Sequence, residues 1–130
     1  MSAAQHLAAA VAKVGAWKPQ IRLNDTTRAY FKRLASISSP ADAKRYLDVF
    51  GADAAQAAAA DDYFLQHEPR HASMLRTSVS PTIIQAGYRI NVIPSEAKAT
   101  LDVRTHPDES LDAFLAEMKK VVNDPAVDVA

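Results

Sequence analysis

The sequence predicts an α+β protein, a two-layer sandwich in which an antiparallel sheet carries helices on one face. Residues 97–104 alternate between apolar and polar side chains with the period of a half-buried strand. Residues 75–84 are rich in Val, Ile, Thr and Ser and form a second predicted strand. Helical patterns precede and follow this pair, and strands that pair as a hairpin with helices alongside form such a sandwich.

The part of the chain before the strands is predicted to be helical in pieces. A first helix lies near the N-terminus, where apolar residues recur with helical spacing and Gly15 marks the end. Asn24 and Asp25 are both candidate caps of the next helix, and Ser39 and Asp53 are the predicted caps of the two that follow. Pro69 ends the last of these helices, which is rich in alanine.

The strands and the final helix have their own signals. Pro81 predicts an edge position or a bulge, because proline cannot donate to a sheet ladder. After Pro107, Asp108 is the predicted cap of an amphipathic helix that ends near residue 123. Val127 and Val129 then begin a last strand. The apolar stripe of that helix comprises Leu111, Phe114, Leu115, Met118, Val121 and Val122.

Composition excludes several classes of function. The 15 basic residues balance the 15 acidic ones, so the chain lacks the positive charge that a nucleic-acid partner requires. No apolar run approaches the roughly 20 residues of a membrane span, and the first residues do not read as a signal peptide. Because cysteine is absent, there are no disulfides or thiolate sites, and the compartment, cytoplasmic or periplasmic, stays open.

The segment His67-Glu68-Pro69-Arg70-His71 matches the letters of a zinc motif, in which two histidines on one helical face bind the metal. Pro69 disfavours the continuous helix that this chemistry needs. We therefore expect a solvated helix end and loop here and no metal ligand in the chain. His6 and His106 have no evident partners and are expected at the surface.

A family resemblance is carried by residues 75–129 and extends to residues 5–17. The turn Asn91-Val92-Ile93-Pro94-Ser95-Glu96-Ala97, a strand ending in Asp102-Val103-Arg104, then a proline and an amphipathic helix resemble the second domain of the zinc aminoacylase and carboxypeptidase family. The long helical stretch is similar to that of the larger bacterial members related to carboxypeptidase S. The resemblance implies a ferredoxin-like sandwich whose first strand is missing from this sequence.

The resemblance also implies a function. Such a domain is the lid and dimerisation domain of a zinc-dependent metallopeptidase or N-acyl amino acid hydrolase, and it forms homodimers or higher oligomers through a sheet edge. Asn91 and Arg104 are then the residues that bind the carboxylate of a peptide or N-acyl amino acid substrate. No catalytic residue and no zinc is expected in this chain, because the zinc domain lies outside it. The chain alone is expected to be inactive.

Alternatives remain at this point. Without the resemblance, Asn91 is a turn residue that holds its neighbour's backbone, and Arg104 is a surface cation at a strand end. The chain could also be a free-standing α+β interaction module that binds a protein partner through an exposed sheet edge, or a small-ligand-binding sandwich. The domain organisation that we expect is one partial lid domain over residues 1–130, with a helical insertion at residues 24–73.

Overall fold

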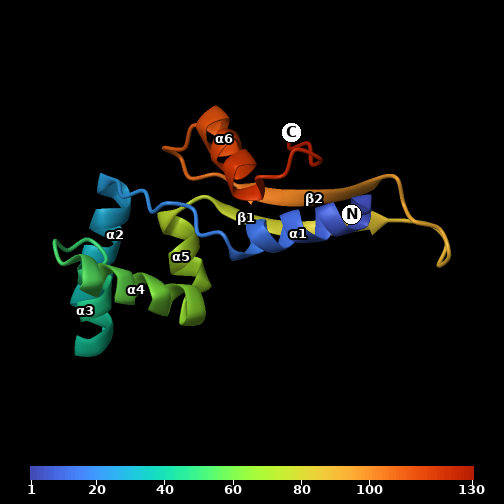
Figure 1. The fold of residues 1–130 in the computed structure, drawn as a ribbon. Coiled ribbons are helices and arrows are strands. Elements are labelled where there is room, and N and C mark those ends of the chain that lie inside the picture. Colours follow the sequence, from blue (N-terminus) through green and yellow to red (C-terminus); the bar gives the residue numbers. More distant parts are fainter. The chain divides into compact units, whose positions relative to one another are not determined.

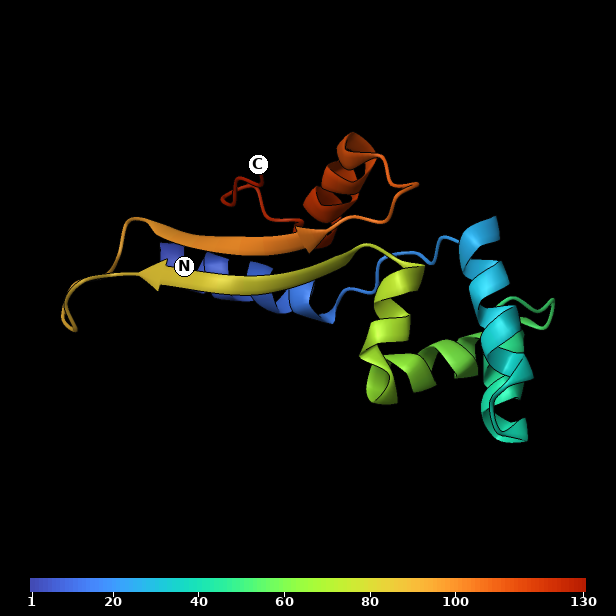
Figure 2. The same cartoon turned by 180° about the vertical axis from the view of Figure 1, so that it is seen from behind.

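The computed structural model describes all 130 residues and has six helices and one two-stranded antiparallel sheet, which confirms the α+β class (Figures 1 and 2). The chain divides into two compact units. The sheet unit comprises residues 1–19 and 77–130, and the helical unit comprises residues 20–76. No helix is both long and apolar enough to cross a lipid bilayer.

The sheet is a hairpin of β1 (Ser78–Ala86) and β2 (Ala97–Arg104). Ser78 pairs with Arg104 at one end, and Ala86 pairs with Ala97 at the other. The register shifts between Pro81 and Ile83. The bulge predicted at Pro81 is therefore confirmed, because Thr82 is an extra residue of β1 without a partner in β2.

Two helices pack on one face of this sheet. Helix α1 (Ala3–Ala16) has a capping box between Ser2 and Gln5 at its start, and helix α6 (Leu111–Val122) is capped by Ser110. Their apolar stripes meet the side chains of Val79 and Leu101, as the two-layer prediction requires. The buried residues of this core are Ala10, Val14, Phe114, Met118 and Val122.

The predicted cap of α6 at Asp108 is wrong. The Ser110 hydroxyl accepts the backbone N–H of Ala113, so the helix starts two residues later than predicted. Asp108 instead lies in a turn, where its backbone N–H donates to Nδ1 of His106 at 3.2 Å. Aspartate and serine are both good helix caps, so the local sequence did not indicate which of Asp108 and Ser110 caps the helix.

The predicted C-terminal strand at Val127 and Val129 is also wrong. Both side chains pack against the core of the sheet unit, but their backbone joins no ladder. β2 pairs with β1 alone, and a groove of about 620 Å³ lies along β2, lined by α1, α6 and the last four residues. A strand needs a neighbouring strand to satisfy its backbone groups, and the C-terminal segment has none.

The helical unit contains α2 (Asp25–Ser36), α3 (Pro40–Asp48), α4 (Ala54–His67) and α5 (Pro69–Leu75). The caps predicted at Asn24, Ser39 and Asp53 are confirmed, because each side chain accepts a backbone N–H in the first turn. Pro69 ends α4 as predicted but also begins α5, where its missing N–H has no cost. The unit has its own core, comprising Phe31, Ala35, Tyr46, Val49, Ala60, Phe64, Ala72 and Leu75.

Candidate functional site

The loop between the two strands carries the first predicted site residue. Gly87 has a φ of 69°, a left-handed conformation that suits glycine, and starts the loop. The backbone N–H of Val92 donates to the carbonyl of Arg89 at 3.3 Å, which closes a four-residue turn. Ile90 and Asn91 are the two central residues of this turn and lie at its apex.

The Asn91 side chain is exposed and has no hydrogen-bond partner in the structure. The turn is held by backbone groups, so the amide of Asn91 is not used to hold its neighbour's backbone. An Asn that does not stabilise its own turn keeps both the donor and the acceptor of its amide for another molecule.

Arg104 is the last residue of β2 and leaves 82% of its side-chain surface exposed. Its Nε donates to Oδ2 of Asp102 at 3.1 Å, two residues earlier on the same face of the strand. An exposed pair of this kind contributes little to stability, so the guanidinium can exchange Asp102 for another carboxylate at small cost.

The structure does not bring Asn91 and Arg104 together. Arg104 pairs with Ser78 at one end of the hairpin, whereas Asn91 lies in the loop beyond Ala97 at the other end. Seven steps of about 3.3 Å separate the two ends of β2, which is about 23 Å. This separation exceeds the combined reach of an arginine and an asparagine side chain, so one copy of the domain cannot hold one carboxylate with both residues.

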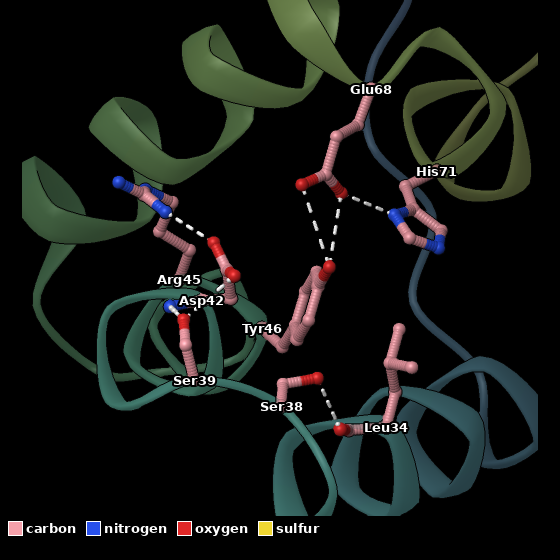
Figure 3. Close-up of polar contacts among 8 residues, drawn as sticks. All are labelled: Leu34, Ser38, Ser39, Asp42, Arg45, Tyr46, Glu68 and His71. Carbon is pink, nitrogen blue, oxygen red and sulfur yellow. Dashed lines mark hydrogen bonds and ion pairs between the residues drawn. The ribbon is translucent and has the colours of Figure 1, made fainter.

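The zinc-like motif straddles a break between two helices, as Pro69 predicts. Figure 3 shows two of its residues, Glu68 and His71, together with Tyr46. The expectation of a solvated loop is wrong for two of its residues. The Glu68 carboxylate accepts hydrogen bonds from Nδ1 of His71 and from the Tyr46 hydroxyl, and the oxygen–oxygen distance to Tyr46 is 3.3 Å. The ring of His71 is surrounded by aromatic rings of the helical core. Nε2 of His71 meets the hydroxyl of Tyr30 at 3.3 Å.

These residues do not fit a metal. His67 is exposed and its ring packs on Tyr63, with the ring centroids 4.6 Å apart, away from the Glu68–His71 pair. The chain has no group of three or more His, Cys, Asp or Glu side chains that could hold a metal ion. Burial and the neighbouring Glu68 carboxylate raise the pKa of the Tyr46 hydroxyl, which keeps it a hydrogen-bond donor.

The other two histidines are not free surface residues. Nδ1 of His6 lies 2.6 Å from Oδ2 of Asp124, and this hydrogen bond lowers the pKa of the Asp124 carboxyl. His106 is only 5% exposed, and its backbone N–H donates to the Thr77 hydroxyl. The prediction that His106 lies at the surface is therefore wrong. The partner of His6 could not be predicted from neighbouring residues, because Asp124 lies 118 positions away in the sequence.

The sequence is similar to one family of known proteins over nearly its whole length. The profile described as "Peptidase dimerisation domain" matches residues 2–130. The human N-fatty-acyl-amino acid synthase/hydrolase is 36% identical over 64 residues, which are 49% of this chain and 13% of that protein. A probable carboxypeptidase S-like protein of Dictyostelium discoideum is 35% identical over 66 residues, which are 51% of this chain and 13% of that protein. No solved structure matches the chain.

The fold is that of a small α+β domain with an unpartnered amide and an exposed arginine at the two ends of its hairpin. The chain belongs to the peptidase dimerisation domain family, since that profile covers nearly all of it. The segment shared with the first relatives spans about one eighth of their length. The resemblance inferred from the turn after Arg89 and the strand up to Arg104 is confirmed.

Proposed function

We propose that this domain serves as the lid and dimerisation domain of a zinc-dependent enzyme that hydrolyses peptides or N-acyl amino acids. Membership of the peptidase dimerisation domain family and the names of the relatives support the reaction class. The proposal assigns the zinc of that enzyme to residues outside this chain, in which no group of three or more His, Cys, Asp or Glu side chains could hold a metal ion. Within the domain, residues 24–73 are an insertion into a partial lid domain over residues 1–130.

In this proposal Asn91 and Arg104 bind the carboxylate of the substrate. The guanidinium of Arg104 offers a planar fork of donors that matches a carboxylate, and the Asn91 amide adds a neutral donor. The observation that carries the assignment is the free amide at the apex of the turn, which has no role in the hairpin itself. The Asp102 carboxylate occupies the Arg104 guanidinium until substrate replaces it.

The hairpin geometry makes the site depend on two copies of the domain. Because about 23 Å of strand separates the two residues, a single carboxylate can meet both only if Asn91 comes from one copy and Arg104 from another. This arrangement would explain why a substrate-binding domain is also a dimerisation domain. In a two-fold dimer the two such sites are identical.

Self-association is proposed to use a sheet edge. The sheet has two strands, so each strand has one neighbour and one open row of backbone N–H and C=O groups. Open edges recruit further strands, and they are the feature that a free-standing interaction module would also use. A groove lies along β2, so we propose that the edge of β1 is the one that pairs with a second copy.

The test compares substrates with and without a carboxylate in the full-length enzyme that carries this domain. Arg104→Ala is expected to lower kcat/KM for an N-acyl amino acid by about 100-fold, as loss of a charged hydrogen bond of about 3 kcal/mol predicts. The same variant is expected to leave the corresponding carboxamide substrate nearly unchanged. Arg89→Ala, which removes an arginine that lies over Tyr88 in the same hairpin, is the matched control. An equal loss on both substrates would contradict carboxylate binding by Arg104.

A further inference from the structure

The helical unit contains a row of three polar side chains that the proposed function does not use. Tyr30 belongs to α2, His71 to α5, and Glu68 lies at the break between α4 and α5. Nε2 of His71 lies 3.3 Å from the Tyr30 hydroxyl. Nδ1 of the same ring faces the Glu68 carboxylate, as Figure 3 shows. Hydrogen bonds thus join a phenol, an imidazole and a carboxylate in that order.

The two hydrogen bonds of His71 determine which of its nitrogens carries the proton. An ionised carboxylate can only accept, so the Nδ1 that faces Glu68 carries the hydrogen. In the neutral imidazole, Nε2 then has a free lone pair and accepts the O–H of Tyr30. The rings of Phe31 and Tyr46 pack against the imidazole, with centroids 5.3 and 5.4 Å away, and hold its orientation. His71 is therefore a base directed at the Tyr30 hydroxyl.

This arrangement has the parts of an activated nucleophile. Such a site needs a nucleophile and a base within hydrogen-bond reach, and a third group that orients the base. His71 and Glu68 expose only 16% and 23% of their side chains, so the base and its orienting group are largely enclosed by the unit. Tyr30 is 41% exposed, so its hydroxyl is the member of the row that a reagent can reach.

We infer that Tyr30 is a nucleophilic tyrosine that activated esters acylate, with His71 as its general base and Glu68 as the group that orients His71. The Oη of Tyr30 attacks the acyl carbon, and the phenol proton moves to Nε2 of His71. The bond from the acyl carbon to the leaving oxygen breaks, and that oxygen takes the electron pair and then the proton from His71. The products are an acyl ester of Tyr30 and a free alcohol or phenol. This inference does not depend on the proposed function.

Reaction of the chain with p-nitrophenyl acetate at about pH 8, where an ordinary imidazole is neutral, tests the assignment. Peptide mass spectrometry measures the rate at which each tyrosine gains an acetyl group. We expect Tyr30 to react about 100-fold faster than Tyr88, although Tyr88 is 79% exposed, because general-base catalysis has effects of this size. The Tyr30 reaction is also expected to slow in heavy water, since a proton moves in its transition state. Equal rates at the two tyrosines, or no slowing of Tyr30 in heavy water, would overturn the inference.

Two histidine variants separate a base from a purely structural hydrogen bond. His71→Gln keeps a hydrogen-bond acceptor for Tyr30 but removes the base, so it is expected to lower the acetylation rate of Tyr30 about 100-fold. Glu68→Gln no longer fixes the proton on Nδ1 and is expected to lower the rate as well. His67→Gln is the matched control, because the His67 ring packs on Tyr63, and it is expected to keep the rate. An unchanged Tyr30 rate in His71→Gln, folded by circular dichroism, would overturn the inference. If that variant does not fold, the heavy-water measurement on the unaltered chain decides.

Discussion

Asp61 and Arg76 form a buried ion pair that links α4 to the end of the helical unit. Next to it, the backbone N–H of Arg22 donates to the carbonyl of Leu75 at 2.7 Å, so the entry and exit of this unit lie side by side. The 57-residue helical unit is therefore closed by a charge pair and a backbone hydrogen bond, and α4 and α5 carry residues of its core.

Breaking this pair is expected to destabilise the helical unit strongly. Asp61→Ala leaves the Arg76 guanidinium buried without its carboxylate, which typically costs about 3–5 kcal/mol of unfolding free energy. Asp48→Ala removes an exposed ion pair with Lys44 in the same unit and is expected to cost about 0.3–0.5 kcal/mol. Urea unfolding followed by circular dichroism measures both. Equal losses in the two variants would show that burial of the Asp61 pair is not what stabilises the unit.

The raised pKa of Tyr46 predicts sensitivity to alkaline pH. Folding favours the neutral phenol, so this contribution to stability is fully present below the ordinary tyrosine pKa, about 10, and is lost as the pH rises through the raised value. Tyr46→Phe is expected to cost about 1 kcal/mol at neutral pH, by loss of the hydrogen bond to Glu68, and to flatten the alkaline decline. Thermal unfolding between pH 8 and pH 11 measures it. Tyr63→Phe is the control, and an identical alkaline decline in Tyr46→Phe would refute the assignment.

The lowered pKa of Asp124 predicts sensitivity to acid in the sheet unit. The ionised carboxylate accepts from Nδ1 of His6 and from the backbone N–H of Ala126, so its stabilising effect is present above the ordinary aspartate pKa of about 3.9 and is lost as the pH falls below it. Asp124→Asn is expected to lower the melting temperature at pH 6 and to reduce its dependence on pH below 4. Asp128→Asn, in an exposed position nearby, is expected to behave like the unaltered chain. The prediction fails if the two variants melt alike.

The open edge of β1 predicts how the domain associates. Ile83 is half-exposed on this strand, and a lysine there discourages edge-to-edge pairing. Ile83→Lys is expected to weaken self-association about tenfold, equivalent to about 1.4 kcal/mol, in sedimentation equilibrium experiments. Ile37→Lys introduces the same charge in the helical unit and is expected to leave the association constant unchanged. A monomeric chain at all concentrations would rule out the edge as a self-association surface.

Sequence patterns predicted correctly those strand bounds and helix starts that depend only on neighbouring residues. The alternation over Ala97–Arg104 matches β2 residue for residue, and the caps at Asn24, Ser39 and Asp53 start helices where predicted, since a cap acts within one turn of the backbone. The two strand patterns, with helical patterns before and after them, also predicted the α+β class.

Features that depend on distant residues were not predictable. His106 is buried, and its backbone N–H donates to the hydroxyl of Thr77, 29 positions earlier. The hydrogen bonds of Glu68 include one to Tyr46 in another helix. Val127 and Val129 have the composition of a strand, but strand formation requires a neighbour that composition does not reveal. The turn motif identified Asn91 and Arg104, but only the pairing of Ser78 with Arg104 shows that they lie at opposite ends of the hairpin.

The central claim is that one substrate site takes Asn91 from one subunit and Arg104 from its partner. The most direct measurement mixes two variants of the full-length enzyme, Asn91→Ala and Arg104→Ala, each expected to be strongly impaired on an N-acyl amino acid, and lets their subunits exchange. A mixed dimer then has one site with both residues intact and one site with neither. We expect an equal mixture to recover about a quarter of the wild-type kcat/KM per subunit for the N-acyl amino acid, because half of the dimers are mixed and each has one working site. Activity that stays at the sum of the two separate variants, with exchange verified by mass spectrometry, would contradict a site shared between subunits.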